Sequence, residues 1–140
     1  MASTHTPFPA KVVTPEGVLF DGDVRQVQVS STAGGLGILA RRAPIVADLK
    51  VGSVSVELED GSWKTWATEE GFAQASDSTA TVVVEDAIDV EAIDAAAAQQ
   101  LIEDATAKLA ETGLEPADER TARRELAWGE HLLAIREQSR

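Results

Sequence analysis

The first part of the chain alternates apolar and polar positions with the two-residue period of β-strands. Three runs carry this pattern most clearly: VRQVQVS at 24–30, VSVEL at 54–58 and ATVVVE at 80–85. Residues that favour turns separate such runs: Pro15-Glu16-Gly17, Asp21-Gly22, Asp60-Gly61 and Glu70-Gly71. Short β-branched runs with regular turns are typical of sandwiches and barrels. We therefore predict an antiparallel β-sandwich or barrel for residues 1–86.

The clearest turn in this region is Asp60-Gly61, which separates VSVELE from SWKTWAT. A hairpin turn of type I′ needs positive φ at both central positions, and an Asp-Gly pair tolerates this well. Because side chains alternate across a strand, Val54, Val56 and Leu58 share one face. We predict a type I′ hairpin here, with those three side chains in the core.

Beyond the β region the pattern changes to the period of a helix. Apolar residues recur at four-residue steps: Ile93, Ala97, Leu101, Ala105 and Leu109. Asp89 is a suitable N-cap for this helix, and Gly113 is a suitable end. Pro116 suits the first turn of a second helix, which should run to about Glu137. Because the connection is short, we predict that residues 87–140 form an antiparallel two-helix hairpin.

Charge and composition exclude several classes of function. The chain has 12 Lys and Arg against 24 Asp and Glu, a formal net charge of −12. Nucleic acids and anionic lipid surfaces select basic proteins, so neither is expected as a partner. With no Cys and only two His, the sequence argues against a metal site. No window approaches the roughly 20 apolar residues that cross a bilayer, so we expect no membrane insertion.

A glycine-rich run, GGLGILARRAPIV at 34–46, raises the question of phosphate binding. Its spacing matches neither the P-loop nor the dinucleotide-binding motif, which favours a turn or bulge in a β domain. We interpret the glycines as backbone freedom for a loop, with Ile38 and Leu39 anchoring it inward. Arg41 and Arg42 would then project toward a partner, or serve only as solvated surface.

No set of residues predicts catalysis. Ser, His and Asp do not occur in a supporting context for a catalytic triad, and the carboxylates are scattered over turns and the helix surface. Acidic pairs such as Glu69-Glu70 and Glu85-Asp86 are best read as solvated faces. We therefore predict that the chain is not an enzyme and uses no cofactor.

Five stretches in order carry a resemblance: TPEGVLFDGDVRQVQV, GGLGILARRAP, DGSWKTWATEEGFAQ, VVVEDAIDV and RRELAW. The chain resembles the epsilon subunit of F-type ATP synthases along nearly its whole length. That family typically reads Gly-x-x-Gly-Ile-Leu-Pro-x-His-Ala-Pro where this chain has GGLGILARRAP. It reads Arg-Ala-Glu-Leu-Ala where this chain has RRELA.

The resemblance implies a non-catalytic subunit of the rotating central stalk. In the family the β-sandwich binds the gamma subunit and rests on the c-ring, coupling proton transport to the catalytic head. The helical hairpin folds against the sandwich or extends along gamma into the alpha/beta head, where it blocks ATP hydrolysis. The implied location is peripheral, at the cytoplasmic face of a bacterial plasma membrane. The alternatives are a β-domain adaptor unrelated to ATP synthase and a small-ligand carrier.

The resemblance also assigns residues to the c-ring-facing loop, namely Gly35, Arg41 and Arg42. The family often carries an acidic residue at the position of Gly35 and a histidine at that of Arg42. Its usual proline is Ala40 here. We expect the loop to dock on the c-ring with different charges.

A nucleotide motif of some bacterial members is degenerate in this chain. The motif reads Ile-Asp-x-x-Arg-Ala, and only Ile88 and Asp89 match it. Ala92 and Ile93 replace the arginine and the alanine. Because no cation is placed to meet a triphosphate, we expect weak or absent ATP binding.

The second predicted helix carries the candidate inhibitory residues. Arg120, Arg123 and Arg124 fall together with His131 on the side opposite the apolar residues. In the family, basic residues of this helix meet acidic segments of the catalytic subunits. Glu130 stands at a position that is often basic. We expect an inhibitor of modest strength.

Overall fold

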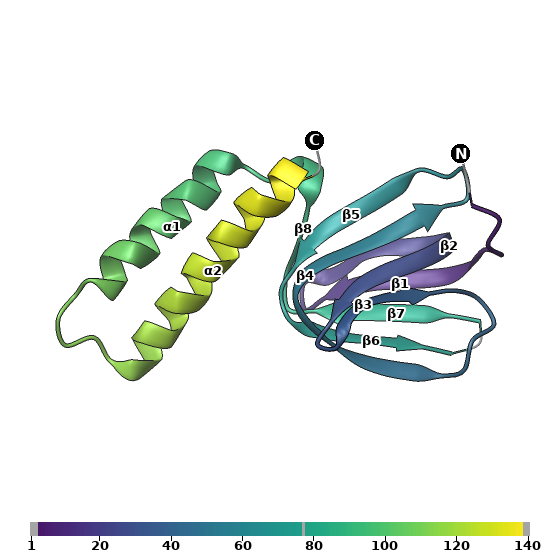
Figure 1. The fold of residues 1–140 in the computed structure, drawn as a ribbon, viewed down its shortest axis with the longest axis horizontal. Helices are drawn as coiled ribbons and strands as arrows, with labels where there is room; N and C mark the ends of the chain where they lie inside the picture. The colour runs from purple at the N-terminus through teal and green to yellow at the C-terminus, as the bar shows by residue number, and fades with distance from the viewer. Residues whose placement is uncertain (1–2, 77, 139–140) are drawn as a thin grey trace. The chain divides into compact units, whose positions relative to one another are not determined.

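The computed structural model describes residues 3–76 and 78–138. Its strands are β1 (Phe8–Thr14), β2 (Gly17–Ser31), β3 (Gly34–Ile38), β4 (Ile45–Leu58), β5 (Trp63–Thr68), β6 (Gly71–Ala75), β7 (Ala80–Val84) and β8 (Ala87–Asp89). A 3-10 turn η1 (Val90–Ala92) precedes the helices α1 (Ala95–Leu109) and α2 (Pro116–Gln138). The chain divides into two compact units, a β unit up to Asp89 and a helical unit from Val90 (Figure 1). The predicted order, a β-sandwich followed by two helices, is confirmed.

Strands β2 and β4 each belong to both layers of the sandwich. The first half of β2 pairs with β1, and its second half pairs with β3 and β4. Strand β4 pairs first with β6 and then with β5 and β2. One layer, here layer A, is therefore β2-β1-β7-β6-β4, and the other, layer B, is β3-β2-β4-β5-β8.

One strand pair departs from the predicted antiparallel arrangement. Strands β1 and β7 run parallel, from the pair Ala10 and Ala80 to the pair Val13 and Val83. The other pairings between described strands are antiparallel. Because β1 and β7 lie at opposite ends of the β unit's sequence, their pairing has no local signal in turns or periodicity.

The core of the sandwich consists mainly of Val and Ala side chains from both layers. Val54 and Val56 are completely buried, and Leu58 packs against them half-buried, as predicted. Trp66 is buried and makes an edge-to-face contact with Phe20, their ring centroids 5.9 Å apart. Small side chains of β1, β6 and β7 are buried in the same core, namely Ala10, Ala73, Ala75 and Ala80.

The β4–β5 hairpin forms at the predicted place, but the prediction of a type I′ turn is wrong. The Gly61 N–H donates to the Leu58 carbonyl (2.9 Å), and the Leu58 N–H donates to the Ser62 carbonyl (2.8 Å). Gly61 has φ 91°, whereas Asp60 is not among the residues with positive φ. These features define a three-residue loop with a glycine bulge. The Asp60 carboxylate stabilises it by accepting from the Ser62 N–H and hydroxyl (2.9 and 2.6 Å).

The first long helix begins later than predicted. Asp94, in extended conformation, is its N-cap and accepts from the N–H groups of Ala96 (2.9 Å) and Ala97 (3.3 Å). The prediction of Asp89 as N-cap was therefore wrong, because Asp89 ends β8 in the sheet instead. Gly113 has φ 76° and lies in the connection between the helices rather than at the end of α1.

The two helices pack as the predicted hairpin through small residues. Ala98 and Ala105 of α1 are buried, and so are Ala122 and Gly129 of α2. Ala97 is exposed, so the buried stripe of α1 runs through Ala98 instead of the predicted position. Ala98 and Ala105 are two turns apart and therefore share one face of α1, which is the face toward Gly129 of α2.

Candidate partner-binding surfaces

The glycine-rich run forms an edge strand, β3, instead of a loop. It pairs with β2 from Gly34 to Ile38. Gly35 and Gly37 do not have positive φ, and a Cβ at either position would meet nothing within 4 Å. The interpretation of these two glycines as loop freedom was therefore wrong. Nothing in the described chain requires glycine at these positions.

The segment after β3 separates the two arginines that the sequence placed together. Arg41 is exposed, with φ 57°. Arg42 is half-buried, and its Nη1 donates to the Gly37 carbonyl (2.7 Å). Arg42 therefore folds back over the edge of β3 and does not project, while Arg41 projects as predicted. Ile38 is buried as expected, but Leu39 is 36% exposed and does not anchor the segment.

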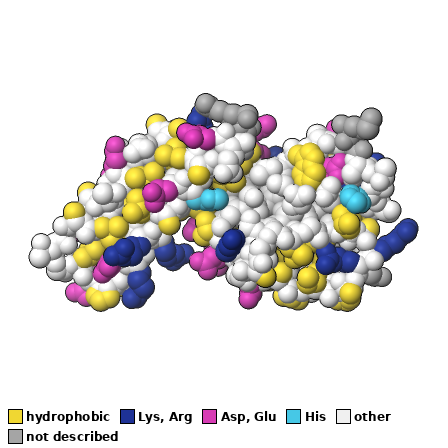
Figure 2. Space-filling view, viewed as in Figure 1, with side chains coloured by type: hydrophobic (Ala, Val, Ile, Leu, Met, Phe, Trp, Pro, Cys, Tyr) yellow, Lys and Arg dark blue, Asp and Glu magenta, His cyan; other side chains and the backbone are white. Residues whose placement is uncertain are grey.

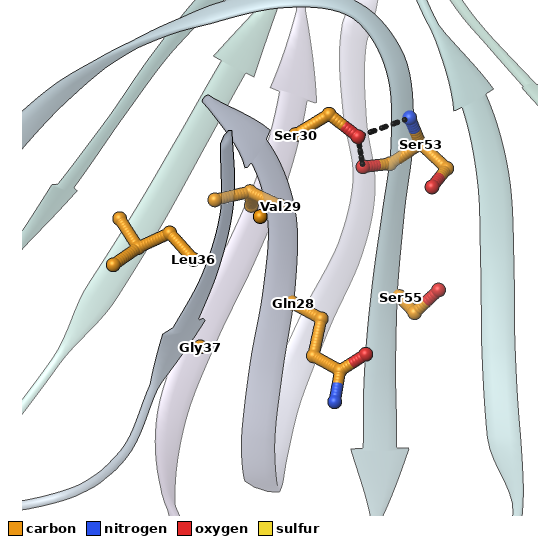
Figure 3. A pocket seen from close by; sticks show the side chains of 8 residues that line it. Gln28, Val29, Ser30, Leu36, Gly37, Ser53 and Ser55 are labelled. Carbon is orange, nitrogen blue, oxygen red and sulfur yellow. Dashed lines mark hydrogen bonds between the residues drawn. The ribbon is translucent and has the colours of Figure 1, made fainter. Parts of the chain in front are cut away.

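The outer face of layer B contains a shallow polar depression of about 380 Å³ (Figure 3). Its lining comprises Gln28, Val29, Ser30, Gly35, Leu36, Gly37, Ser53 and Ser55. The Ser30 hydroxyl accepts from the Ser53 N–H (3.1 Å) and donates to the Ser53 carbonyl (3.4 Å). No lining side chain is ionisable, so the depression has no group for acid–base catalysis. Its neutral hydroxyls and amide suit contact with a protein.

An apolar row crosses the outer face of layer A. Val18 pairs with Val13, Val13 with Val83, and Val83 with Phe72, so the four side chains lie next to one another on four strands. Val18 is 58% exposed and Phe72 is 39% exposed, while the two valines between them are half-buried. A continuous exposed apolar row of this kind is typical of a surface that another protein covers.

A buried carboxylate, Glu57, holds the N-terminal segment on the outer face of layer B. It is only 2% exposed and accepts from the Gln26 side chain (2.9 Å) and the Ser3 N–H (2.7 Å). These hydrogen bonds, with the nearby positive charge of Arg25, lower the pKa of Glu57 to about 2. The alternation of β4 puts Glu57 on the solvent side, so the sequence carries no signal for its burial.

The predicted basic residues of α2 are all at the surface. Arg120, Arg123 and Arg124 are exposed, and Lys and Arg side chains gather over the N-terminal part of α2 in Figure 2. Arg123 donates through Nε and Nη2 to a Glu119 oxygen (3.1 and 2.9 Å). His131 is half-buried and packs on Trp128, their ring centroids 5.7 Å apart. The outward cationic surface is therefore made by the three arginines without the histidine.

The two residues that match the nucleotide motif lie in β8. Ile88 pairs with Ala67, and Asp89 pairs with Trp66. The Asp89 carboxylate accepts from Lys64 Nζ at 2.8 Å. A cation of this chain therefore already contacts the carboxylate, and Asp89 is separated from α1 by the η1 turn.

Residues 3–76 and 78–138 contain no group of three or more His, Cys, Asp or Glu side chains placed to hold a metal ion. Among these residues there is also no helix with the length and apolar character needed to span a membrane. The surfaces described above are thus the candidates that remain.

Comparison with known proteins identifies the family. Residues 7–90 match the family model described as ATP synthase, Delta/Epsilon chain, beta-sandwich domain. The chloroplastic ATP synthase epsilon chain of Lotus japonicus is 38% identical over 100 residues, covering 71% of this chain and 74% of the relative. The chain belongs to the epsilon subunits of F-type ATP synthase. The epsilon chain of Lacticaseibacillus casei is 34% identical over 113 residues, covering 79% of each.

Solved structures agree with this family at the level of fold. A chain in the cryo-EM structure of the Euglena gracilis mitochondrial ATP synthase, OSCP/F1/c-ring, superposes with TM-score 0.78 at 21% identity. The match covers 95% of this chain and 84% of that chain. A chain from the central stalk/c-ring of the Tetrahymena thermophila enzyme superposes with TM-score 0.57 at 13% identity, covering 96% and 99%. Because both matches cover at least 95% of this chain, its fold as a whole has counterparts in solved ATP synthase structures.

Membership of the epsilon family settles the broad role of the chain. It is a rotor subunit of ATP synthase and has no catalytic role of its own. This result disfavours an unrelated adaptor. The polar depression without ionisable groups and the exposed apolar row fit a subunit that works through protein contacts.

Proposed function

We propose that the β unit couples c-ring rotation to the catalytic head by binding the gamma subunit through layer A. The observation that carries the proposal is the exposed row Val18, Val13, Val83 and Phe72. A permanent partner that covers this row gains the free energy of burying it. Gamma is the partner that the family resemblance implies for the sandwich.

The contact with the c-ring is assigned to the other layer, at β3 and the segment that follows it. Gly35 lines the depression there and Arg41 projects from the surface beyond the strand. Arg42 supports this segment through its hydrogen bond to the Gly37 carbonyl. In this proposal Arg41 contacts the c-ring and Arg42 positions the segment.

The hairpin is proposed to inhibit ATP hydrolysis by extending into the alpha/beta head. The exposed Arg120, Arg123 and Arg124 support it, since they can meet acidic segments of catalytic subunits. The pair between Arg123 and Glu119 lies at the surface, so exchanging Glu119 for a partner carboxylate costs little. The proposed location is the cytoplasmic face of a bacterial plasma membrane, which the bacterial relatives support.

Binding to a purified gamma subunit tests the first part. Phe72→Gln combined with Val18→Ser should weaken the complex about tenfold, because buried apolar anchors dominate such interfaces. Trp63→Gln is the matched control, since Trp63 is 47% exposed but lies on the other layer. Equal affinities for the double variant and the unchanged chain would rule out layer A as the gamma surface.

ATP hydrolysis by the assembled enzyme tests the regulatory part. Removal of residues 90–140 should raise hydrolysis, and Arg120→Glu with Arg124→Glu should raise it in part. For coupling, Arg41→Glu should lower proton-driven synthesis while the β unit stays folded. Unchanged hydrolysis after the truncation would refute the inhibitory role, and unchanged synthesis would refute the role of Arg41.

A further inference from the structure

Strand β8 is the last element of the β unit. Its pairing with β5 involves fewer residues than any other pairing between the described strands. It pairs with β5 at the edge of layer B through Ala87, Ile88 and Asp89. Short edge strands expose their hydrogen bonds and open locally at low free-energy cost. The helical unit begins at the next residue, Val90. Whether β8 is paired with β5 therefore decides at which residue the connector to the hairpin leaves the sandwich.

A charged contact holds the final residue of this strand. Lys64 Nζ lies 2.8 Å from Asp89 Oδ2, and the two side chains are 41% and 27% exposed. The same ammonium group lies 5.5 Å from the ring centroid of Trp66, within the range of a cation–π contact. Trp66 is buried in the core, so it gives Lys64 a fixed support. The ion pair thus joins β8 to a rigid part of the sandwich.

We propose that the Lys64–Asp89 ion pair controls release of β8 from β5, and that this release lengthens the connector to the helical hairpin. Freed residues 87–89 would span up to ~10 Å when extended, at about 3.4 Å per residue. The length of the connector to the hairpin then depends on the charge of Lys64 and on ionic strength, and it does not require a bound nucleotide. The regulatory consequence rests on the proposed inhibitory function, whereas the release of β8 does not.

Amide hydrogen exchange on the full-length chain tests the release. Lys64→Met removes the charge but keeps an unbranched apolar stem over Trp66. Exchange at Ala87–Asp89 should become about threefold faster, as expected for a partly exposed ion pair. Raising the salt from 50 mM to 500 mM should have a similar effect on the unchanged chain and little on the variant.

Two controls make this result specific. Lys50→Met, which removes another exposed lysine, should leave exchange in β8 unchanged. Exchanging the charges, Lys64→Asp with Asp89→Lys, should slow exchange relative to either single variant. Unchanged exchange in Lys64→Met, or no rescue by the charge exchange, would overturn the proposal.

Hydrolysis by the assembled enzyme tests the consequence. Lys64→Met should change the degree of inhibition about threefold, and the change should vanish when residues 90–140 are absent. If exchange responds but hydrolysis does not, the lengthened connector has no regulatory effect and that half of the proposal fails. If removal of residues 90–140 never alters hydrolysis, the inhibitory function fails while the exchange result still supports release of β8.

Discussion

Gly129 of α2 lies directly against Ile102 of α1. A Cβ added at Gly129 would come within 2.8 Å of Ile102 Cγ1 and 3.1 Å of the Ala98 carbonyl oxygen. The helices can therefore approach to this distance only because position 129 has no side chain. This contact sets the spacing of the hairpin that the proposed function requires.

Replacing Gly129 should loosen the hairpin despite the better helix propensity of the new residue. Alanine gains about 1 kcal/mol within a helix, but overpacking costs about 1–3 kcal/mol. We expect Gly129→Ala to lower the stability of the helical unit by about 1 kcal/mol, measured by urea unfolding at 222 nm. Adding Ile102→Ala to this variant should relieve part of the overlap between the two helices. A variant more stable than the unchanged chain would show that the spacing is not tight.

Two glycines of the β unit should respond oppositely to alanine. At Gly71 an added Cβ would overlap the backbone of Val83 and Val84, whereas at Gly35 it would meet nothing within 4 Å. Gly71→Ala should destabilise by about 2 kcal/mol or more, since backbone of β7 would have to move. Gly35→Ala should be neutral or up to about 1 kcal/mol stabilising. Thermal unfolding of both variants, followed by tryptophan fluorescence, distinguishes these outcomes.

Glu57 should make the β unit acid-sensitive. Hydrogen bonds from Gln26 and Ser3 lower its pKa from 4.5 to about 2 in the folded state. A lowered folded pKa stabilises the protein above the unfolded value, and this contribution is lost as the pH falls from about 4.5 through 2. Urea midpoints should therefore fall over that window in the unchanged chain. Glu57→Gln should show a smaller fall there, and an identical slope would contradict the assignment.

Asp94 should stabilise the start of α1. Its carboxylate accepts from the Ala96 and Ala97 N–H groups, so Asp94→Ala should cost about 1 kcal/mol. Asp94→Asn keeps an acceptor and should cost much less. Exchange rates of the two amides report the effect directly. The same change at Asp89 should leave these amides unaffected, since Asp89 lies outside the helix.

The sequence predicted the residues of the candidate surfaces only where their exposure follows from the local pattern of apolar and polar positions. The helical period was sufficient to place Arg120, Arg123 and Arg124 at the surface of α2. It was not sufficient for Arg42, whose partner is a carbonyl of the preceding strand. Nor could it pair Asp89 with Lys64, because that contact depends on which strand β8 joins.

What the sequence determined by itself is the set of local elements: strands of period two, a hairpin near Asp60, and a second helix beginning at Pro116. Alternation, turn residues and proline act over a few neighbouring positions, so their effects can be read without the fold. The tertiary structure decided the parallel pairing of β1 with β7, the burial of Glu57 and the place of Asp89 in β8 instead of at the start of α1. These features depend on partners distant in sequence, whose contacts exist only once both layers have closed around the common core.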